Sequence, residues 1–259
     1  MPSPFLALSG IEYAIGPKSI LRGIDLTLEQ GRIYGLVGPN GSGKSTLLKI
    51  IARQVAPKSG AIAFGGKPAG DWGAREFARH IAYMPQFTPA TDGMTVRELI
   101  ALGRFPWHGT LGRFTATDRN KVEDAIVRTE LENFADRLVA NMSGGERQRA
   151  WIAMMLAQDA RCLLLDEPTS ALDLAHQASV LSLVQELSHE RGLTVILVLH
   201  DINLAARYCD AIVALNRGQI TAEGTPGEIM QADKLHSIFG VGMGVFPHPV
   251  RNEPVSYLL

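Results

Sequence analysis

Residues 38–45 have the types and spacing of a loop that binds phosphate groups. They read Gly-Pro-Asn-Gly-Ser-Gly-Lys-Ser and fit the pattern G-x-x-x-x-G-K-[ST]. Glycines let backbone N–H groups turn inward around a phosphate, and a helix starting at Lys44 adds the positive end of its dipole. We expect the Lys44 ammonium to contact the β- and γ-phosphates and the Ser45 hydroxyl to bind Mg²⁺. The residues of this segment predicted to contact a nucleoside triphosphate are Gly38, Pro39, Asn40, Gly41, Ser42, Gly43, Lys44, Ser45 and Thr46.

Two adjacent carboxylates, Asp166 and Glu167, follow the apolar run Cys-Leu-Leu-Leu. Open α/β sheets bind ligands at the carboxyl ends of their strands, so we expect both acids to face the bound nucleotide. Asp166 is predicted to hold Mg²⁺ through water, and Glu167 to orient and deprotonate the water that attacks the γ-phosphorus. The alternative is a solvated strand end before Pro168, which the phosphate-binding loop makes the weaker interpretation.

His200 ends a second apolar run, residues 195–199. A lone histidine is usually a satisfied polar residue. At the end of a strand beside the Asp166 strand, however, it can reach the γ-phosphate and position the attacking water. We therefore predict that His200, Glu167 and Lys44 are the catalytic residues.

Ser143, Gly144, Gly145 and Glu146 form the pattern of a capping box at a helix start. Two consecutive glycines weaken a first turn unless a close approach requires them, and exposed N–H groups at a helix start suit a phosphate. One nucleotide cannot easily occupy both this segment and the phosphate-binding loop of one chain. A head-to-tail dimer that sandwiches two ATP molecules would let each ATP contact both segments.

The elements that position these residues alternate between strands and helices. Short apolar runs at residues 33–37, 162–165, 195–199 and 212–215 are typical of buried parallel strands, and helical periodicity follows Lys44 and spans residues 174–187. Residues 87–142 have helical spacing broken by glycine and proline, which predicts an insertion of several helices. Residues 20–28 are predicted to form an antiparallel strand at an edge. The chain after Leu215 has room for a strand or two and a short helix. An α/β fold follows.

Composition excludes several other classes of protein. The 259 residues are 46% hydrophobic, which is inconsistent with disorder, and the net charge of −1 provides no global field that would recruit nucleic acid. The three tryptophans lack a surrounding lattice of basic residues, so we expect no nucleic-acid partner. Two cysteines are too few for a disulfide framework. The amino end has no signal-peptide pattern, and residues 150–157, a long apolar stretch, are too few to cross a bilayer.

Together with Gln86 and the segment Ser170-Ala-Leu-Asp173, these motifs resemble the ATP-binding subunit of ABC transporters. The resemblance implies an α/β P-loop NTPase (RecA-like) core with a helical subdomain and an antiparallel β subdomain. It implies a single ABC ATPase domain over residues 1–259. Residues 1–86 and 150–240 would form its discontinuous catalytic core, residues 87–149 the helical subdomain, and residues 241–259 a short C-terminal extension.

The resemblance also implies roles for single residues. Gln86 would couple the γ-phosphate and Mg²⁺ to the helical subdomain, and Tyr13, 25 residues before Gly38, would stack on adenine. Asp173 belongs to the loop that communicates across the dimer. Met142 stands where the family usually has leucine, a change that conserves volume. The residues implied to contact the partner's ATP are Ser143, Gly144, Gly145, Glu146 and Asp173, and those implied to hold Mg²⁺ are Ser45, Gln86 and Asp166.

Residues 95–108 and 146–158 resemble more specifically the iron-siderophore importer ATPases of the ferric-hydroxamate uptake type. By that resemblance the chain is an ATPase coupled to transmembrane transport, with ATP and Mg²⁺ as cofactors. Its partners would be a second copy of itself, an integral membrane permease and, indirectly, a siderophore-binding protein, at the cytoplasmic face of the inner membrane. Three alternatives stay open: import of another cargo such as cobalamin or haem, a soluble ABC-type ATPase that remodels DNA or ribosomes, and a P-loop kinase.

Overall fold

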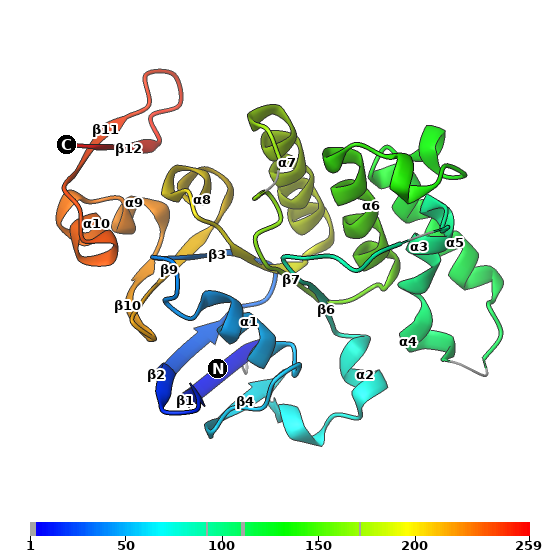
Figure 1. Ribbon diagram of the computed structural model, residues 1–259, viewed down its shortest axis with the longest axis horizontal. Coiled ribbons are helices and arrows are strands. Elements are labelled where there is room, and N and C mark those ends of the chain that lie inside the picture. The colour runs from blue at the N-terminus through cyan, green and yellow to red at the C-terminus, as the bar shows by residue number, and fades with distance from the viewer. Residues whose placement is uncertain (1–3, 92, 110–111, 171) are drawn as a thin grey trace. The chain divides into compact units, whose positions relative to one another are not determined.

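The computed structural model describes residues 4–91, 93–109, 112–170 and 172–259. The contacts of the chain divide it into two units, each discussed by itself. The first comprises Met1–Trp72 and Ser188–Leu259, and the second comprises Gly73–Leu187. Figure 1 labels the elements of both units along the chain.

The first unit contains an antiparallel sheet of four strands in the order β2-β1-β4-β5. Its strands are β1 (Leu6–Ile15), β2 (Lys18–Leu28), β4 (Ser59–Phe64) and β5 (Lys67–Pro68). A short 3₁₀ turn, η1 (Ala69–Asp71), follows β5. The prediction of an antiparallel strand over residues 20–28 is confirmed, because β2 pairs with β1 in antiparallel register and lies at the edge of this sheet.

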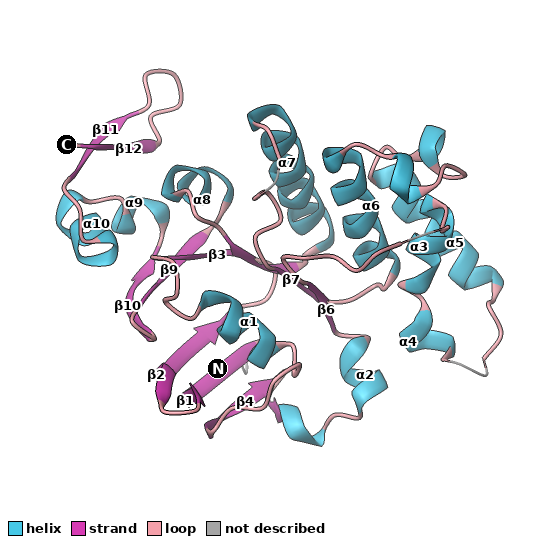
Figure 2. Cartoon of the chain, viewed as in Figure 1, coloured by secondary structure: helices cyan, strands magenta, loops and turns pink. Residues whose placement is uncertain are grey.

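A largely parallel group of strands, in the order β10-β9-β3-β8, forms the other sheet region of the first unit. Figure 2 labels β10, β9 and β3 of this group. Strands β3 (Ile33–Val37), β8 (Thr194–Val198) and β9 (Ala211–Asn216) run parallel, and β10 (Gln219–Gly224) is antiparallel to β9. Every residue of β3 and β8 is buried, as expected of parallel strands. The strands predicted at 33–37, 195–199 and 212–215 are confirmed to within one or two residues.

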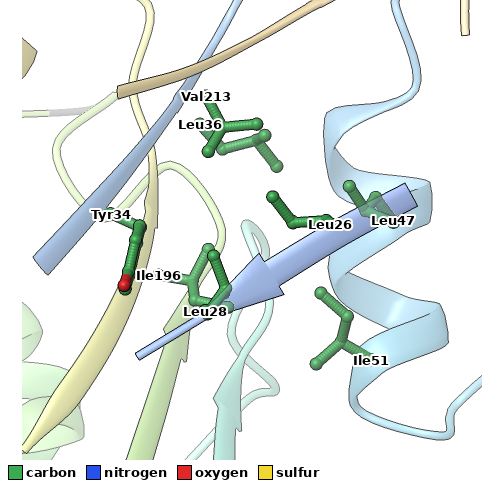
Figure 3. Close-up of a pocket in the computed structure, with 8 residues that line it drawn as sticks. All are labelled: Leu26, Leu28, Tyr34, Leu36, Leu47, Ile51, Ile196 and Val213. Atoms are coloured by element: carbon green, nitrogen blue, oxygen red, sulfur yellow. The ribbon is translucent and has the colours of Figure 1, made fainter. Parts of the chain in front are cut away.

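Helix α1 (Lys44–Ile51) shares one apolar core with both sheet regions of this unit. Figure 3 shows side chains from α1, β2 and the parallel strands around a small apolar cavity. The residues that line it are Leu26, Leu28, Tyr34, Leu36, Leu47, Ile51, Ile196 and Val213. This core fixes the helix that follows the phosphate-binding loop.

The C-terminal part of the first unit contains more elements than the sequence predicted. Helix α8 (Ile202–Tyr208) follows β8, and helices α9 (Pro226–Ile229) and α10 (Ala232–Phe239) follow β10. Strands β11 (Met243–Pro247) and β12 (Pro254–Leu258) then form a separate antiparallel hairpin. The expectation of one or two strands and one short helix after Leu215 was therefore too low. Strands β11 and β12 in particular are short and half exposed, so they show little apolar pattern.

The second unit combines two parallel strands with a group of helices. Strand β6 (Ile81–Met84) pairs with β7 (Cys162–Leu165), which confirms the strand predicted at 162–165. The helices are α2 (Ala74–Ala78), α3 (Val96–Leu102), α4 (Phe105–His108), α5 (Ala116–Arg128), α6 (Gly144–Ala157) and α7 (Leu174–Arg191), with 3₁₀ turns η2 (Glu132–Phe134) and η3 (Val139–Asn141). Helix α7 begins in this unit and its last residues belong to the first. The several helices predicted within residues 87–142 are confirmed, and the subdomain boundaries stay a prediction.

Helices α3, α5 and α6 pack against one another, and a buried ion pair joins them. Arg104 Nε lies 2.8 Å from Asp118 Oδ1, with both side chains at most 5% exposed. Arg104 also donates to the carbonyl of Ala157 at 2.7 Å, which ties the start of α4 to the end of α6. Burial alone would raise the pKa of Asp118, but hydrogen bonds from Thr115 and the charge of Arg104 outweigh it and lower that pKa to about 2.

Both cysteines, Cys162 on β7 and Cys209 after α8, are free and buried. No helix of the described residues is long and apolar enough to span a bilayer.

Candidate nucleotide-binding site

Glycine is required at two positions of the loop between β3 and α1. Gly38 has φ +137°, and a Cβ there would lie 1.9 Å from the carbonyl oxygen of Leu215. Gly43 has φ +108°, and a Cβ there would lie 2.6 Å from Leu21 Cδ2. Both positions combine a left-handed backbone with a close neighbour, so a side chain at either would move the loop. The loop therefore has the backbone that the phosphate-binding pattern demands.

The Lys44 side chain is held across this loop. It is 5% exposed, and its Nζ donates to the carbonyl oxygens of Gly38 at 2.8 Å and Pro39 at 3.0 Å. The N-cap of α1 is Gly43, which has no side chain to cap the first-turn N–H groups. A helix N-terminus of this kind, beside an ammonium, is a site for an anion such as phosphate.

Tyr13 and His200 lie in the same unit as the loop. Tyr13 pairs with Leu21, the residue whose side chain packs against Gly43, so Tyr13 lies on the strand pair that covers the loop. Leu199 donates its N–H to the carbonyl of Leu36 at 3.2 Å, which places the exposed His200 at the end of the strand beside β3. These contacts fix the strands that carry both residues to the elements around the loop.

In the second unit, Gln86 and Glu167 are joined directly. Gln86 Nε2 donates to Glu167 Oε2 at 2.5 Å, because the pairing of Met84 with Leu165 aligns the ends of β6 and β7. Glu167 has φ +52°, in the left-handed region that side chains rarely adopt. Strained backbone of this kind is concentrated at functional sites. The structure thus brings together two of the residues that the sequence had singled out.

Asp166 is 2% exposed, and its Oδ2 lies 3.5 Å from the hydroxyl of Tyr83. Burial, together with the Asp166 charge, raises the pKa of Tyr83 to about 12. The phenol therefore keeps its proton at neutral pH and donates a hydrogen bond to the carboxylate. The sequence analysis missed Tyr83, and the only signal for it was its position directly before Met84, the last residue of a short apolar run.

The capping box predicted at Ser143 and Glu146 is confirmed. The Ser143 N–H donates to Glu146 Oε2 at 2.8 Å, and the Glu146 N–H donates to Ser143 Oγ at 3.3 Å. Hydrogen bonds that the Ser143 backbone N–H and side chain give to the Glu146 carboxylate hold its pKa below the usual value. The carboxylate of Glu146 is therefore engaged in the cap, and the glycine N–H groups are the groups of this segment suited to a phosphate.

Gly145 and Asp173 are connected through His176, a residue that the sequence analysis did not identify. A Cβ on Gly145 would lie 2.1 Å from His176 Cδ2, and His176 Nδ1 lies 2.8 Å from Asp173 Oδ1. The backbone N–H of His176 also donates to that oxygen. This hydrogen bond is the largest of the contributions that lower the pKa of Asp173. Ala171, in the predicted segment Ser170-Ala-Leu-Asp173, lies outside the described residues.

Arg149 connects helix α6 to its neighbours. It donates to the carbonyl of Thr129 at 3.2 Å and to Glu130 Oε2 at 2.5 Å, and it contacts Ser179 Oγ of α7. The sequence alone gave no specific role to this arginine. The contacts make it a link from α6 to the end of α5 and to α7.

The chain is similar in sequence to a family model and to import ATP-binding proteins. The family model for the ABC transporter matches residues 21–170. The iron(3+)-hydroxamate import ATP-binding protein FhuC of Bacillus subtilis (strain 168) is 40% identical over 246 residues, covering 95% of this chain and 91% of that protein. The hemin import ATP-binding protein HmuV of Streptomyces coelicolor is 42% identical over 243 residues, covering 94% and 86%.

Two solved structures extend the comparison. A transporter described as of metal-chelate type, in an inward-facing conformation, has a TM-score of 0.85 at 26% identity, covering 99% of this chain and 97% of that one. The dimeric structure of an ATP-binding cassette in a post-hydrolysis state, bound to ADP and Pi, has a TM-score of 0.73 at 29% identity, covering 85% and 98%.

Proposed function

The chain belongs to the ABC transporter family, and from this we propose that it is the ATP-hydrolysing subunit of a membrane importer for an iron(III) chelate of the hydroxamate siderophore type. ATP-binding subunits of ABC transporters are ATPases coupled to transport. The observation that carries the ATPase proposal is the phosphate-binding loop with its buried Lys44 ammonium at the start of α1. The cargo rests on the likeness to iron-hydroxamate and other siderophore import subunits.

We assign binding of the triphosphate to the loop of residues 38–46. On nucleotide binding, the Lys44 ammonium exchanges the carbonyl oxygens of Gly38 and Pro39 for phosphate oxygens. Tyr13 would stack on the adenine. These assignments predict that Lys44 and the glycines determine how tightly the phosphates bind.

Hydrolysis needs a base for the attacking water, and we assign that role to Glu167. Its carboxylate follows β7 and is held by the Gln86 amide, which orients it before a nucleotide is present. His200 would position the same water from the end of β8. Both residues act on the γ-phosphorus, so their loss should slow turnover more than it weakens ATP binding.

Ser45, Gln86 and Asp166 offer a hydroxyl, an amide oxygen and a carboxylate, which is the hard oxygen donor set that Mg²⁺ takes. The Gln86–Glu167 hydrogen bond uses the amide nitrogen, so the amide oxygen is the atom that would face the metal. When bound, Mg²⁺ neutralises charge on the β- and γ-oxygens.

We further propose that two copies of the chain share each nucleotide in a head-to-tail dimer. Ser143, Gly144, Gly145 and Glu146, with Asp173, would contact the ATP held by the loop of the partner copy. A related ATP-binding cassette, 29% identical, has a dimeric structure with ADP and Pi. The permease would bind this dimer at the cytoplasmic face of the membrane, and a siderophore-binding protein would act through the permease.

Glu167→Gln tests the assigned base in the purified chain. This variant should bind ATP as the parent does, yet hydrolyse it at least about tenfold more slowly, which corresponds to roughly 1.4 kcal/mol of barrier. Measured turnover equal to that of the parent would refute the role of Glu167.

Uptake of radiolabelled ferric hydroxamate by cells with and without Lys44→Ala tests the cargo. We expect the variant to abolish uptake, and equal uptake in both strains would reject the iron-hydroxamate cargo. Parallel assays with labelled haem and cobalamin separate the alternative cargoes. Only the true cargo should lose its uptake in the variant.

Two other activities can be distinguished by what the chain binds and by where the phosphate goes. A soluble ATPase that remodels DNA or ribosomes would bind nucleic acid in a salt-sensitive manner instead of co-purifying with an integral membrane permease. A P-loop kinase would transfer phosphate to a small molecule instead of to water.

A further inference from the structure

The C-terminal hairpin is fastened to helix α8 through one asparagine. The Asn203 side-chain oxygen accepts from the Ser256 N–H at 2.7 Å and from the Ser256 hydroxyl at 3.0 Å, and its Nδ2 donates to the Ser256 carbonyl at 3.1 Å. Ser256 lies in the middle of β12 and is 6% exposed. The amide of Asn203 thus pairs with this residue on both its donor and its acceptor sides, and β12 contacts α8.

Asn203 is also part of the start of α8, three residues after His200. Asp201 is the N-cap residue, and its Oδ1 accepts from the backbone N–H of Asn203 at 2.7 Å. The backbone N–H of Asn203 therefore bonds to the N-cap residue, and the Asn203 side chain bonds to the hairpin. The cap hydrogen bond therefore links Asn203 to Asp201, the residue next to His200.

The opposite side of α8 is fixed against β3, the strand that leads into the phosphate-binding loop. A Cβ on Gly35 would lie 2.9 Å from Cys209 Sγ and 3.3 Å from Ala205 Cβ, so helix and strand are in close contact. Upstream of His200, the Leu199 N–H is bonded to the carbonyl of Leu36. The His200 segment is thus linked to β3 through Leu199, and to the hairpin through Asp201 and Asn203.

We propose that Asn203 is a positioning residue for hydrolysis, through which the hairpin of β11 and β12 sets the place of His200. The hairpin thereby contributes to the ATPase reaction without touching the nucleotide. This inference rests on the proposed role of His200 in positioning the attacking water. It predicts a loss in kcat with little change in KM, because the hydrogen bonds between Asn203 and Ser256 do not involve the phosphate-binding loop.

The test compares Asn203→Ala with a matched asparagine in the 259-residue chain. Asn216→Ala is the control, since Asn216 Nδ2 also ties the C-terminal region to a strand, through the carbonyls of Ile238 at 3.2 Å and Ser237 at 3.4 Å in helix α10. We expect Asn203→Ala to lower kcat about tenfold with KM for ATP within about twofold, and Asn216→Ala to leave both unchanged. Equal effects of the two variants would overturn the proposal.

A milder variant and a double variant keep the test sharp if Asn203→Ala folds poorly. Asn203→Asp retains the acceptor for the Ser256 N–H and hydroxyl but places an oxygen against the Ser256 carbonyl, so it should lower kcat by a smaller factor. In a His200→Ala background, Asn203→Ala should cause no further loss, because the two residues act in one chain of contacts. A full additional loss there would overturn the proposal.

The same measurements separate the two hypotheses. If His200→Ala alone leaves kcat unchanged, the role proposed for His200 fails, and the inference about Asn203 fails with it. If His200→Ala slows turnover while Asn203→Ala matches Asn216→Ala, only the positioning role of Asn203 is refuted.

Discussion

Asp118 is the counter-ion of a buried arginine, and its ionisation is coupled to the stability of the helices around it. Its carboxylate pairs with Arg104 and also accepts from the Thr115 N–H and hydroxyl. Removal of one partner of a buried ion pair leaves the other charge without compensation. Asp118→Asn is therefore expected to lower the free energy of unfolding at neutral pH by about 3 kcal/mol.

The pH dependence of this difference identifies its cause. The pKa of Asp118 is about 2 in the folded chain, below its value of about 3.9 in the unfolded chain. The stabilisation is then fully present above about pH 4 and is lost as the pH falls from there toward about 2. Denaturant unfolding of parent and variant from neutral pH downward should show the difference shrinking over this window. A constant difference would assign the effect to packing instead.

At the scale of secondary-structure elements, helix α8 packs closely on β3 at a glycine of the strand, Gly35. Gly35→Ala would bring its Cβ within 2.9 Å of Cys209 Sγ, a buried neighbour. We expect a loss of about 1–3 kcal/mol in the free energy of unfolding, the usual result of overpacking a core. Gly70→Ala is the matched control, since its Cβ meets no described atom within 4 Å. Thermal unfolding compares the two, and equal midpoints would contradict the prediction.

The sequence predicted those elements whose pattern is local. Apolar runs in the sequence predicted the buried strands β3, β7, β8 and β9. Helical periodicity predicted the helix after the phosphate-binding loop. The contacts of Tyr83 with Asp166 and of His176 with Gly145 were not predicted, because they depend on how β6 pairs with β7 and on how α6 approaches α7. The C-terminal hairpin was missed for a related reason. Its strands are short and half exposed, and Asn203 holds it from another part of the chain.

At the scale of the whole molecule, the proposed shared site makes assembly depend on ATP. Glu167→Gln with ATP and Mg²⁺ should double the 28.1 kDa mass of the chain in solution, because ATP bound without hydrolysis holds two copies together. Light scattering with and without ATP measures the change. A constant monomer mass at saturating ATP would contradict the head-to-tail dimer.

Gly144 offers a control for this assembly. A Cβ there meets only Leu172 Cδ2 at 3.6 Å among the described atoms, so the single chain has room for a larger residue. Gly144→Arg in the Glu167→Gln background should therefore retain ATP binding and lose dimerisation. Dimerisation at the same ATP concentration as the parent variant would exclude Gly144 from the interface.

The burial of Cys162 and Cys209 has a practical consequence for studies of motion. Burial raises the pKa of both thiols, so they stay protonated and unreactive toward maleimides or spin labels at neutral pH. A cysteine introduced at exposed Lys18 and another at exposed Glu132 would be the labelled pair, one in each unit. Electron paramagnetic resonance could then follow the separation of the two units through the catalytic cycle in a protein that keeps its native thiols.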